Sequence, residues 1–416
     1  MTRRTPAAML DAGGTMANLA VDLFGLHFPN PVWPAAGPTV RDGAMILRQV
    51  AGGAGGVVCK TISSEAAPVP KYHMLNLARN RRGGMLNSEL WSELPPEQWL
   101  EREYAIALTA GVPVVASLGY SAAEVARLGK AAEAAGVHAL EVTVHYAAEE
   151  PWQVMKTLRE AVSIPIIAKL SPHDPATVIE TARKLEPFVD GIAAINSLGP
   201  ALRIDIEACQ RTLGTEYGYG WLSGPPIKPV ALRIVFDLAR TVKVPVIGVG
   251  GIRTGADVVE FLMAGASAVQ VCTANILEGP GVFARLNREL AAWLDAHGVA
   301  SVGEIVGRFP QKLGAEAGRT LAGVGTTGRV HFSGPPPTVE PARCTLCDLC
   351  VTSCAYDALR IDKVASPEAV IVEGERCFVC GLCVTVCPTA ALRLDLDPAL
   401  GPAGAIQPEP RSGGRA

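Results

Sequence analysis

Residues 344–354 read CTLCDLCVTSC, and residues 377–388 read CFVCGLCVTVCP. Each run holds four cysteines in the order C-x-x-C-x-x-C-x-x-x-C, and together the runs contain eight of the 11 cysteines of the chain. This spacing is typical of thiolates that hold [4Fe–4S] clusters, where one tight loop supplies three ligands and a distant run supplies the fourth. The two runs therefore predict a small C-terminal ferredoxin-like domain with two [4Fe–4S] clusters.

In paired arrays of this kind, the fourth cysteine of each run ligates the other cluster. We therefore expect one cluster to be bound by Cys344, Cys347, Cys350 and Cys387, and the second by Cys377, Cys380, Cys383 and Cys354. Zinc sites and disulfides are the alternatives. A zinc ion needs only four ligands, however, and no secretory signal favours oxidation. The first run ends in Cys-Ala instead of Cys-Pro, which is a small departure from the pattern.

Length, charge and hydropathy narrow the class of protein. The chain has 416 residues, enough for one large and one small domain, and a formal net charge of -3. No block of like charges favours nucleic acid or an anionic membrane surface, and no run of about 18 apolar residues could span a membrane. Residues 1–18 lack the apolar core of a signal peptide and predict a disordered leader, unless Met16 is the true start. We therefore expect a cytoplasmic protein.

Between Pro31 and Gly298, short apolar runs alternate with amphipathic helical patterns. We expect strands at Pro31–Gly37, Gly56–Ser63, Val112–Leu118, Ala139–Tyr146, Ile164–Ser171, Gly191–Ser197, Val244–Gly251 and Ala268–Ala274. The clearest helical patterns are Ala122–Ala135, Pro151–Val162, Pro175–Leu185, Pro229–Arg240 and Ala256–Ala264. This count and size predict an α/β fold, the (β/α)8 TIM barrel. A doubly wound open sheet is the alternative, but the chain lacks the early glycine-rich turn of such folds.

The domain boundaries follow from these patterns. We expect the barrel at residues 19–300, a stiff linker at 301–339 that ends in Gly-Pro-Pro-Pro, the cluster domain at 340–394 and a disordered tail at 395–416. Two barrel connections, Ser64–Glu93 and Leu198–Lys228, are unusually long. Both follow strands at the C-terminal face of the barrel, where active sites of this fold are built.

Short motifs stand at the predicted strand ends and in these two connections. They are Ala35-Ala36-Gly37-Pro38-Thr39, Cys59-Lys60-Thr61, Leu86-Asn87-Ser88-Glu89-Leu90, Ala168-Lys169-Leu170, Asn196-Ser197, Ser223-Gly224, Gly250-Gly251 and Cys272-Thr273. In this order they resemble the flavin barrel of the dihydroorotate dehydrogenase family. With the cluster domain attached, the chain is most similar to the catalytic half of dihydropyrimidine dehydrogenases, including their bacterial subunit form. The resemblance covers about Val21 to Leu394.

The resemblance implies an FMN-binding barrel. Its cofactor-binding residues would be Ala36, Gly37, Lys60, Thr61, Lys169, Asn196, Ser223, Gly224, Gly250, Gly251, Cys272 and Thr273, and its substrate-binding residues Asn87, Glu89, Asn196 and Ser197. Lys169 would stabilise the anionic reduced flavin near its N1–C2 carbonyl. Each motif also has a purely structural interpretation. The two lysines could be solvent-directed cations at strand ends, and Gly250-Gly251 could form an ordinary turn. The Asn-Ser-Glu motif could lie in an exposed loop, and Cys272 could be an apolar packing residue.

The fourth strand departs from the family pattern. Family members carry an Asn there, and in the pyrimidine enzymes a Cys on the following mobile loop is the general acid. Here Thr143 replaces the Asn, a helix follows almost at once, and no Cys remains. His145 and Tyr146 are the candidate proton donors in this stretch, unless they are only wall and rim residues. The missing loop argues against uracil or thymine as substrate, and more strongly against dihydroorotate.

The resemblance implies an FMN- and iron–sulfur-dependent oxidoreductase that oxidises or reduces a CH–CH bond beside an activating group, as in dihydropyrimidine dehydrogenase. The rival hypothesis is an electron-transfer subunit of a larger complex without a substrate site of its own. We find no second nucleotide-binding domain and no glycine-rich FAD or NAD fingerprint in the sequence. We therefore expect a separate electron partner, either a flavin/NAD(P)H subunit or a ferredoxin, and a homo- or hetero-oligomer.

Overall fold

The computed structural model describes residues 17–68, 72–78, 83–143, 150–172, 175–316, 335–362, 364 and 369–394. The chain divides into two compact units, Met1–Lys312 and Leu313–Ala416. Within the described residues, no helix is both long enough and apolar enough to cross a membrane.

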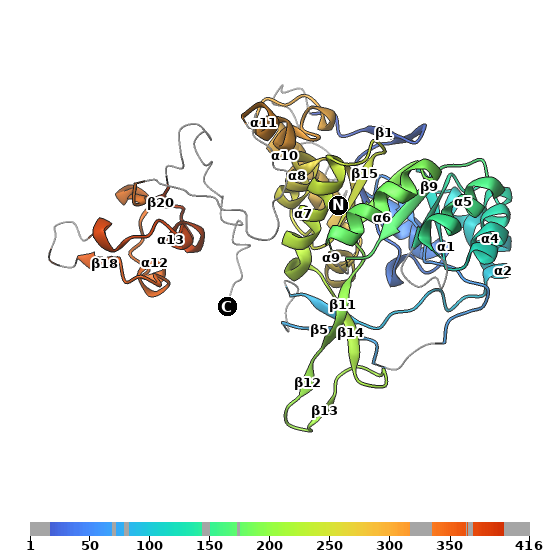
Figure 1. The fold of residues 1–416 in the computed structure, drawn as a ribbon, viewed down its shortest axis with the longest axis horizontal. Helices are drawn as coiled ribbons and strands as arrows, with labels where there is room; N and C mark the ends of the chain where they lie inside the picture. The colour runs from blue at the N-terminus through green and yellow to red at the C-terminus, as the bar shows by residue number, and fades with distance from the viewer. Residues whose placement is uncertain are drawn as a thin grey trace, which may run out of the picture. The chain divides into compact units, whose positions relative to one another are not determined.

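Eight parallel strands form the nearly closed barrel of the first unit (Figure 1). In chain order they are β3 (Val32–Pro34), β4 (Val57–Val58), β7 (Val114–Leu118), β8 (Ala139–Thr143), β9 (Ile166–Leu170), β10 (Gly191–Ala194), β15 (Val246–Val249) and β16 (Ala266–Val271). Hydrogen-bonded neighbours run in the order β3-β16-β15-β10-β9-β8-β7-β4. β3 and β4, the two strands at the ends of this order, meet where Gly55 N–H donates to Val32 O at 3.1 Å. The predicted TIM barrel with its eight strands is confirmed.

Helices cover the outside of the barrel. The principal ones are α1 (Gly43–Ala51), α3 (Tyr104–Leu108), α4 (Ala122–Ala134), α5 (Pro151–Ala161), α6 (Pro175–Leu185), α7 (Lys228–Ala239), α8 (Gly255–Ala264) and α10 (Gly281–Ala296). Two of them begin with capping boxes, Ser121–Glu124 at α4 and Thr254–Asp257 at α8, which satisfy the first free N–H groups. Short helices at Pro96–Gln98 (α2) and Thr273–Glu278 (α9) complete the layer.

An N-terminal hairpin packs against the interior of the barrel. Strands β1 (Val21–Leu23) and β2 (Leu26–Phe28) pair antiparallel. The Phe28 ring stacks on Trp33 of β3, with centroids 4.1 Å apart. Both rings are fully buried in one cluster with the inward-facing side chains of the strands, such as Ile167 and Ala193. The hairpin therefore closes the packed interior at the amino ends of the strands. The carboxyl ends remain available for a site.

The two long connections form a second sheet that the sequence did not predict. Strands β5 (Met74–Asn76) and β6 (Met85–Asn87) come from the first connection, and β11 (Leu198–Leu202) and β14 (Tyr219–Ser223) from the second. They pair in the order β11-β14-β6-β5, so segments more than 100 residues apart in sequence lie side by side. The small hairpin of β12 (Ile204–Asp205) and β13 (Gln210–Arg211) projects from this sheet away from the barrel (Figure 1).

The first unit extends beyond the expected boundary at residue 300. A turn at Val302–Glu304 and helix α11 (Arg308–Glu316) follow the barrel, and Val302 and Ile305 are buried in its core. Asn18 N–H donates to Ala300 O at 2.8 Å, which ties the start of the described chain to this segment. Residues 301–312 therefore belong to the barrel unit and not to the linker, because their apolar side chains complete its outer core. Residues 1–16 of the leader expected at 1–18, and the tail expected at 395–416, lie outside the described residues. The other two leader residues, Ala17 and Asn18, belong to the barrel unit, because Ala17 is buried in its core and Asn18 is bonded to Ala300.

The second unit is small and internally repeated. Its strands are β17 (Thr338–Val339), β18 (Leu359–Asp362), β19 (Ala369–Val372) and β20 (Leu392–Arg393), paired β17–β20 and β18–β19. Short helices α12 (Leu349–Thr352) and α13 (Leu382–Val386) each begin inside one cysteine run. The core contains Cys350, Cys383, Leu359 and Val370. Cysteines thus take part in the packing of this unit.

Candidate active site and cluster sites

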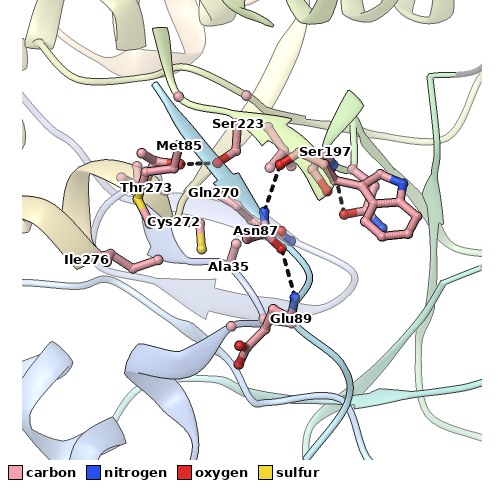
Figure 2. Close-up of a pocket in the computed structure, with 18 of the residues that line it drawn as sticks. Ala35, Met85, Asn87, Glu89, Ser197, Ser223, Gln270, Cys272, Thr273 and Ile276 are labelled. Carbon is pink, nitrogen blue, oxygen red and sulfur yellow. Dashed lines mark hydrogen bonds between the residues drawn. The ribbon is translucent and has the colours of Figure 1, made fainter. Parts of the chain in front are cut away.

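One pocket opens among the carboxyl ends of the barrel strands and the antiparallel sheet (Figure 2). Every sequence-predicted flavin or substrate residue lines it: Ala36, Gly37, Lys60, Thr61, Asn87, Glu89, Lys169, Asn196, Ser197, Ser223, Gly224, Gly250, Gly251, Cys272 and Thr273. Thr143, at the end of β8, lines it as well. His145 and Tyr146, the candidate proton donors, lie outside the described residues.

A buried charged group joins side chains of three barrel strands. Lys169 Nζ on β9 lies 3.2 Å from Glu141 Oε1 on β8. Gln270 on β16 joins both, because its Nε2 donates to Glu141 Oε2 at 2.6 Å and its Oε1 accepts from Lys169 Nζ at 3.2 Å. Glu141 is fully buried, and the Lys169 side chain is 6% exposed. The ammonium group is therefore held in place at the pocket by two fixed oxygen partners.

A second charged group includes the polar side chains of the first long connection. Lys60 Nζ, at the end of β4, contacts Glu89 Oε1. Glu89 Oε2 lies 3.1 Å from Nε2 of His73, the residue that precedes β5. Asn87 Nδ2 donates to Trp221 O at 3.2 Å across the β6–β14 pair, and Asn87 Oδ1 accepts from Glu89 N–H at 3.3 Å. The antiparallel sheet therefore sets the position of the Asn-Ser-Glu motif, which is not a free loop.

Closely packed backbone forms another part of the wall. Gly251 has φ of 76°, in the left-handed region that favours glycine. A methyl group at this position would lie 2.7 Å from Lys228 Cβ and 2.9 Å from Gly224 O. Nearby, Thr273 Oγ1 donates to Ser223 Oγ at 2.9 Å, at the opposite end of the labelled residues from Glu89 (Figure 2). Backbone amides and small hydroxyls at such turns are the groups that bind phosphate.

Cys272 packs against the pocket floor. A methyl group at Gly37 would lie 2.9 Å from Cys272 Sγ, so glycine is needed at that strand end for steric reasons. Burial raises the pKa of the Cys272 thiol, and the positive charges of Lys169 and Lys60 offset only part of this effect. A thiol with a raised pKa is a poor nucleophile. These contacts support a packing role for Cys272.

In the second unit, the eight cysteines line two separate cavities. Cys344, Cys347, Cys350 and Cys387 line the first, and Cys354, Cys377, Cys380 and Cys383 line the second. Each cavity therefore combines three cysteines of one run with the fourth of the other, as the spacing predicts. Among the described residues, no three such ligand side chains converge on a point where one metal ion could bind. Each quartet lies around a cavity instead.

Backbone N–H groups contact the fourth sulfur of each run. Ala358 N–H donates to Cys354 Sγ at 3.3 Å, and Ala391 N–H donates to Cys387 Sγ at 3.2 Å. The donor stands four residues after the cysteine in both runs. Hydrogen bonds to cluster sulfurs are one of the means by which a protein sets reduction potentials.

Comparisons with known proteins agree with this geometry. The family model described as dihydroorotate dehydrogenase matches residues 139–294. The chain is 36% identical over 302 residues to the "Dihydroorotate dehydrogenase B (NAD(+)), catalytic subunit" of Methanothermobacter thermautotrophicus, covering 70% of this chain and 97% of that relative. The chain belongs to the dihydroorotate dehydrogenase family.

Other members of the family and a second domain model extend this result. The protein of the same name from Thermococcus kodakarensis is 38% identical over 307 residues, covering 70% of this chain and 98% of the relative. The model described as "4Fe-4S dicluster domain" matches residues 343–391. The chain is therefore a flavoprotein oxidoreductase of this family with an iron–sulfur domain, and it is longer than these relatives.

Three side chains at the site were not predicted from the sequence. Glu141 and Gln270 could have been recognised from the sequence, because a charged or amide side chain inside a buried apolar strand requires a partner. His73 could not, since its position depends on the pairing of β5 with β6. Nothing in the sequence around His73 distinguishes it from the other histidines of the chain.

Proposed function

We propose that the chain binds FMN in the barrel pocket and two [4Fe–4S] clusters in the second unit. We further propose that it transfers a hydride to or from a CH–CH bond of a small substrate. The observation that carries this proposal is the convergence, in one pocket, of a phosphate-type backbone turn at Gly250-Gly251, a buried cation at Lys169 and hydrogen-bonding groups at Asn87 and Glu89. Bound FMN would supply the exchange between hydride and single electrons.

The residues of the pocket fit the parts of FMN. The turn around Gly251, together with Ser223 and Thr273, offers backbone and hydroxyl donors to a phosphate. Ala36 and Gly37 leave room for a flat ring, and Lys169 stands ready to balance negative charge on it. The two cysteine-lined cavities fit one cube each, with thiolate ligands as proposed from the spacing.

The side chains of this protein would bind and orient the substrate. Asn87 can donate and accept hydrogen bonds, and the carboxylate of Glu89 can accept them. Neutral, planar compounds with amide-like edges and a C=C bond beside a carbonyl match these groups. This class includes open-chain unsaturated amides as well as pyrimidines, although the missing loop after the fourth strand argues against uracil and thymine themselves. A pure electron relay has no need of such groups, so the pocket lining weighs against the rival hypothesis of a subunit without a substrate site.

A separate electron partner is part of the proposal. The relatives are named as the catalytic subunit of an NAD(+) enzyme, and such a name implies another subunit. We infer that the two clusters carry electrons between FMN and such a partner, either a flavin/NAD(P)H subunit or a ferredoxin.

The test is a substrate panel with the anaerobically purified full chain. Dithionite-reduced protein is mixed with uracil, thymine, orotate and open-chain unsaturated amides, while flavin absorbance is followed. Oxidised protein is mixed with the corresponding saturated compounds. We expect at least one compound to reoxidise or bleach the flavin in a saturable manner. A protein that exchanges electrons with a ferredoxin but reacts with no panel compound would support the rival hypothesis of an electron-transfer subunit and contradict ours.

A further inference from the structure

A row of three ionisable side chains begins at the pocket and becomes more exposed with each member. The Lys60 side chain is 2% exposed, that of Glu89 13% and that of His73 24%. Lys60 and Glu89 line the pocket. The carboxylate of Glu89 contacts Lys60 through Oε1 and His73 Nε2, at 3.1 Å, through Oε2. A carboxylate and an imidazole in contact, one in a pocket and the other nearer to solvent, are suited to passing a proton.

The backbone fixes this arrangement on both sides. Ser88 N–H donates to His73 O at 2.8 Å, and Glu89 N–H donates to Asn87 Oδ1 at 3.3 Å. His73 precedes β5 and Glu89 follows β6, and the two strands are paired. The antiparallel sheet therefore brings the imidazole and the carboxylate together. A simple anchor for Glu89 would need only the ammonium group of Lys60. The second partner is instead an imidazole, whose two ring nitrogens can accept a proton on one side and donate one on the other.

We propose that Glu89 and His73 form a proton relay between the pocket and solvent. The proposal rests on the proposed function, because a CH–CH oxidation releases one hydride and one proton. As the hydride leaves one carbon, the C–H bond on its neighbour breaks, its electron pair forms the C=C bond, and the proton passes to Glu89. Glu89 then gives the proton to His73 Nε2, and His73 releases it to water. Reduction runs the same steps in reverse, with the hydride electrons supplied by the proposed FMN and clusters.

Lys60 is a positioning residue in this scheme. It holds Glu89 Oε1 and so keeps Oε2 facing His73. Each carboxylate oxygen retains a second lone pair for the substrate proton. Release of a proton from Nδ1 leaves the ring protonated at Nε2, so the imidazole must return to its Nδ1–H form by exchange with water before the next turnover.

Chemical rescue tests the outer member of the relay. His73→Ala should lower kcat at least about tenfold, with KM changed less than about threefold, and imidazole in the medium should restore kcat, because small bases can replace a missing shuttle. Glu89→Gln should lower kcat by roughly 10²–10⁴-fold without rescue. The matched control is His27→Ala on β2, where an exposed histidine pairs with Asp22 at 2.8 Å. Full turnover in either relay variant, or a loss that imidazole does not restore in His73→Ala, would overturn the proposal.

A second measurement needs no substrate. Infrared difference spectra between the reduced and oxidised full chain should contain a carboxyl band that disappears in Glu89→Gln and shifts in His73→Ala. This band is expected because negative charge in the pocket should draw a proton into the pair. Absence of any band sensitive to Glu89→Gln would overturn the relay. If the wild-type chain uses no panel compound, the proposed function fails, and the infrared result alone decides on the relay.

Discussion

Lys169 Nζ and Glu141 Oε1 lie 3.2 Å apart on the neighbouring strands β9 and β8, where neither side chain is more than 6% exposed, and Lys169 lines the pocket. The pair places one positive and one negative charge at fixed positions beneath the proposed flavin site. In a site with little water, solvent screens such charges less than it does at the surface, so they act more strongly on a bound redox group. The two residues should therefore shift the potential of the flavin in opposite directions.

Lys169→Ala should lower the reduction potential of the flavin. Loss of a nearby cation makes the anionic reduced form less favourable by on the order of 1–3 kcal/mol, which is about 20–60 mV for a two-electron couple. Anaerobic dye titration of the purified full chain measures this potential. The control is Lys156→Ala on α5, whose side chain is 52% exposed and pairs with Glu160 on the surface. A potential equal to that of the control would remove Lys169 from its proposed place.

Glu141→Gln should raise the potential of the flavin instead. The substitution keeps the shape of the side chain but removes the negative charge that partly balances Lys169. Breaking a buried pair on one side also destabilises the fold by about 3–5 kcal/mol, so the midpoint of thermal unfolding should fall. Glu160→Gln, on the exposed surface of α5, should change neither quantity. A lower potential in Glu141→Gln would contradict the assumption that its carboxylate opposes the charge of Lys169.

The barrel and the cluster domain could be predicted because each leaves a repeating pattern in the sequence. Parallel strands covered on both faces are continuously apolar, as at Val114–Leu118, and cluster ligands must follow a fixed spacing. The extent of the barrel unit was harder to predict. Residues 301–312 contain only two deeply buried side chains, Val302 and Ile305, so the segment resembles a linker in composition.

The wall of the pocket could be predicted only in part. Glycines and lysines at strand ends can be recognised from the sequence of a single strand. The contact between His73 and Glu89 depends instead on how two connections pair with each other. The β6–β14 register joins Asn87 to Trp221 across 134 positions of the sequence. No local pattern contains such pairings, because they are decided by the closure of the barrel that brings the two connections together.

Substitution in one cysteine quartet should remove one cluster. Wild-type protein prepared anaerobically should contain about eight iron atoms per chain, as two cubes require. Cys350→Ser and Cys383→Ser should each lose about four of them, because their thiols line different cavities. Cys209→Ser, an exposed cysteine of the barrel unit, should retain all eight. Iron and sulfide assays measure the content, and zinc in place of iron would refute the assignment.

Direct reduction by NADH or NADPH should be slow. The proposed route brings electrons through the clusters from a separate partner, in agreement with the name of the relatives as catalytic subunits. Dithionite should bleach the flavin of the isolated chain promptly, whereas either nicotinamide should leave it oxidised over the same time. Stopped-flow absorbance under anaerobic conditions separates the two cases. Prompt bleaching by NADH without a partner would show that this chain has a nicotinamide site of its own.

The stretch after β8 supplies the alternative to Glu89 as proton donor. His145 and Tyr146 follow Thr143, which lines the pocket, so either side chain is within a few residues of the site. If the relay through Glu89 and His73 is correct, His145→Gln combined with Tyr146→Phe should retain turnover to within about tenfold, because general acid catalysis by one group contributes roughly 10²–10⁴-fold. The comparison is made with a compound that the wild-type chain uses. Flavin reduction through the clusters should be unaffected in both the double variant and Glu89→Gln, because electron flow needs neither group. A large loss of turnover in the double variant, with Glu89→Gln fully active, would move the proton donor to the strand-four segment, as the sequence first suggested.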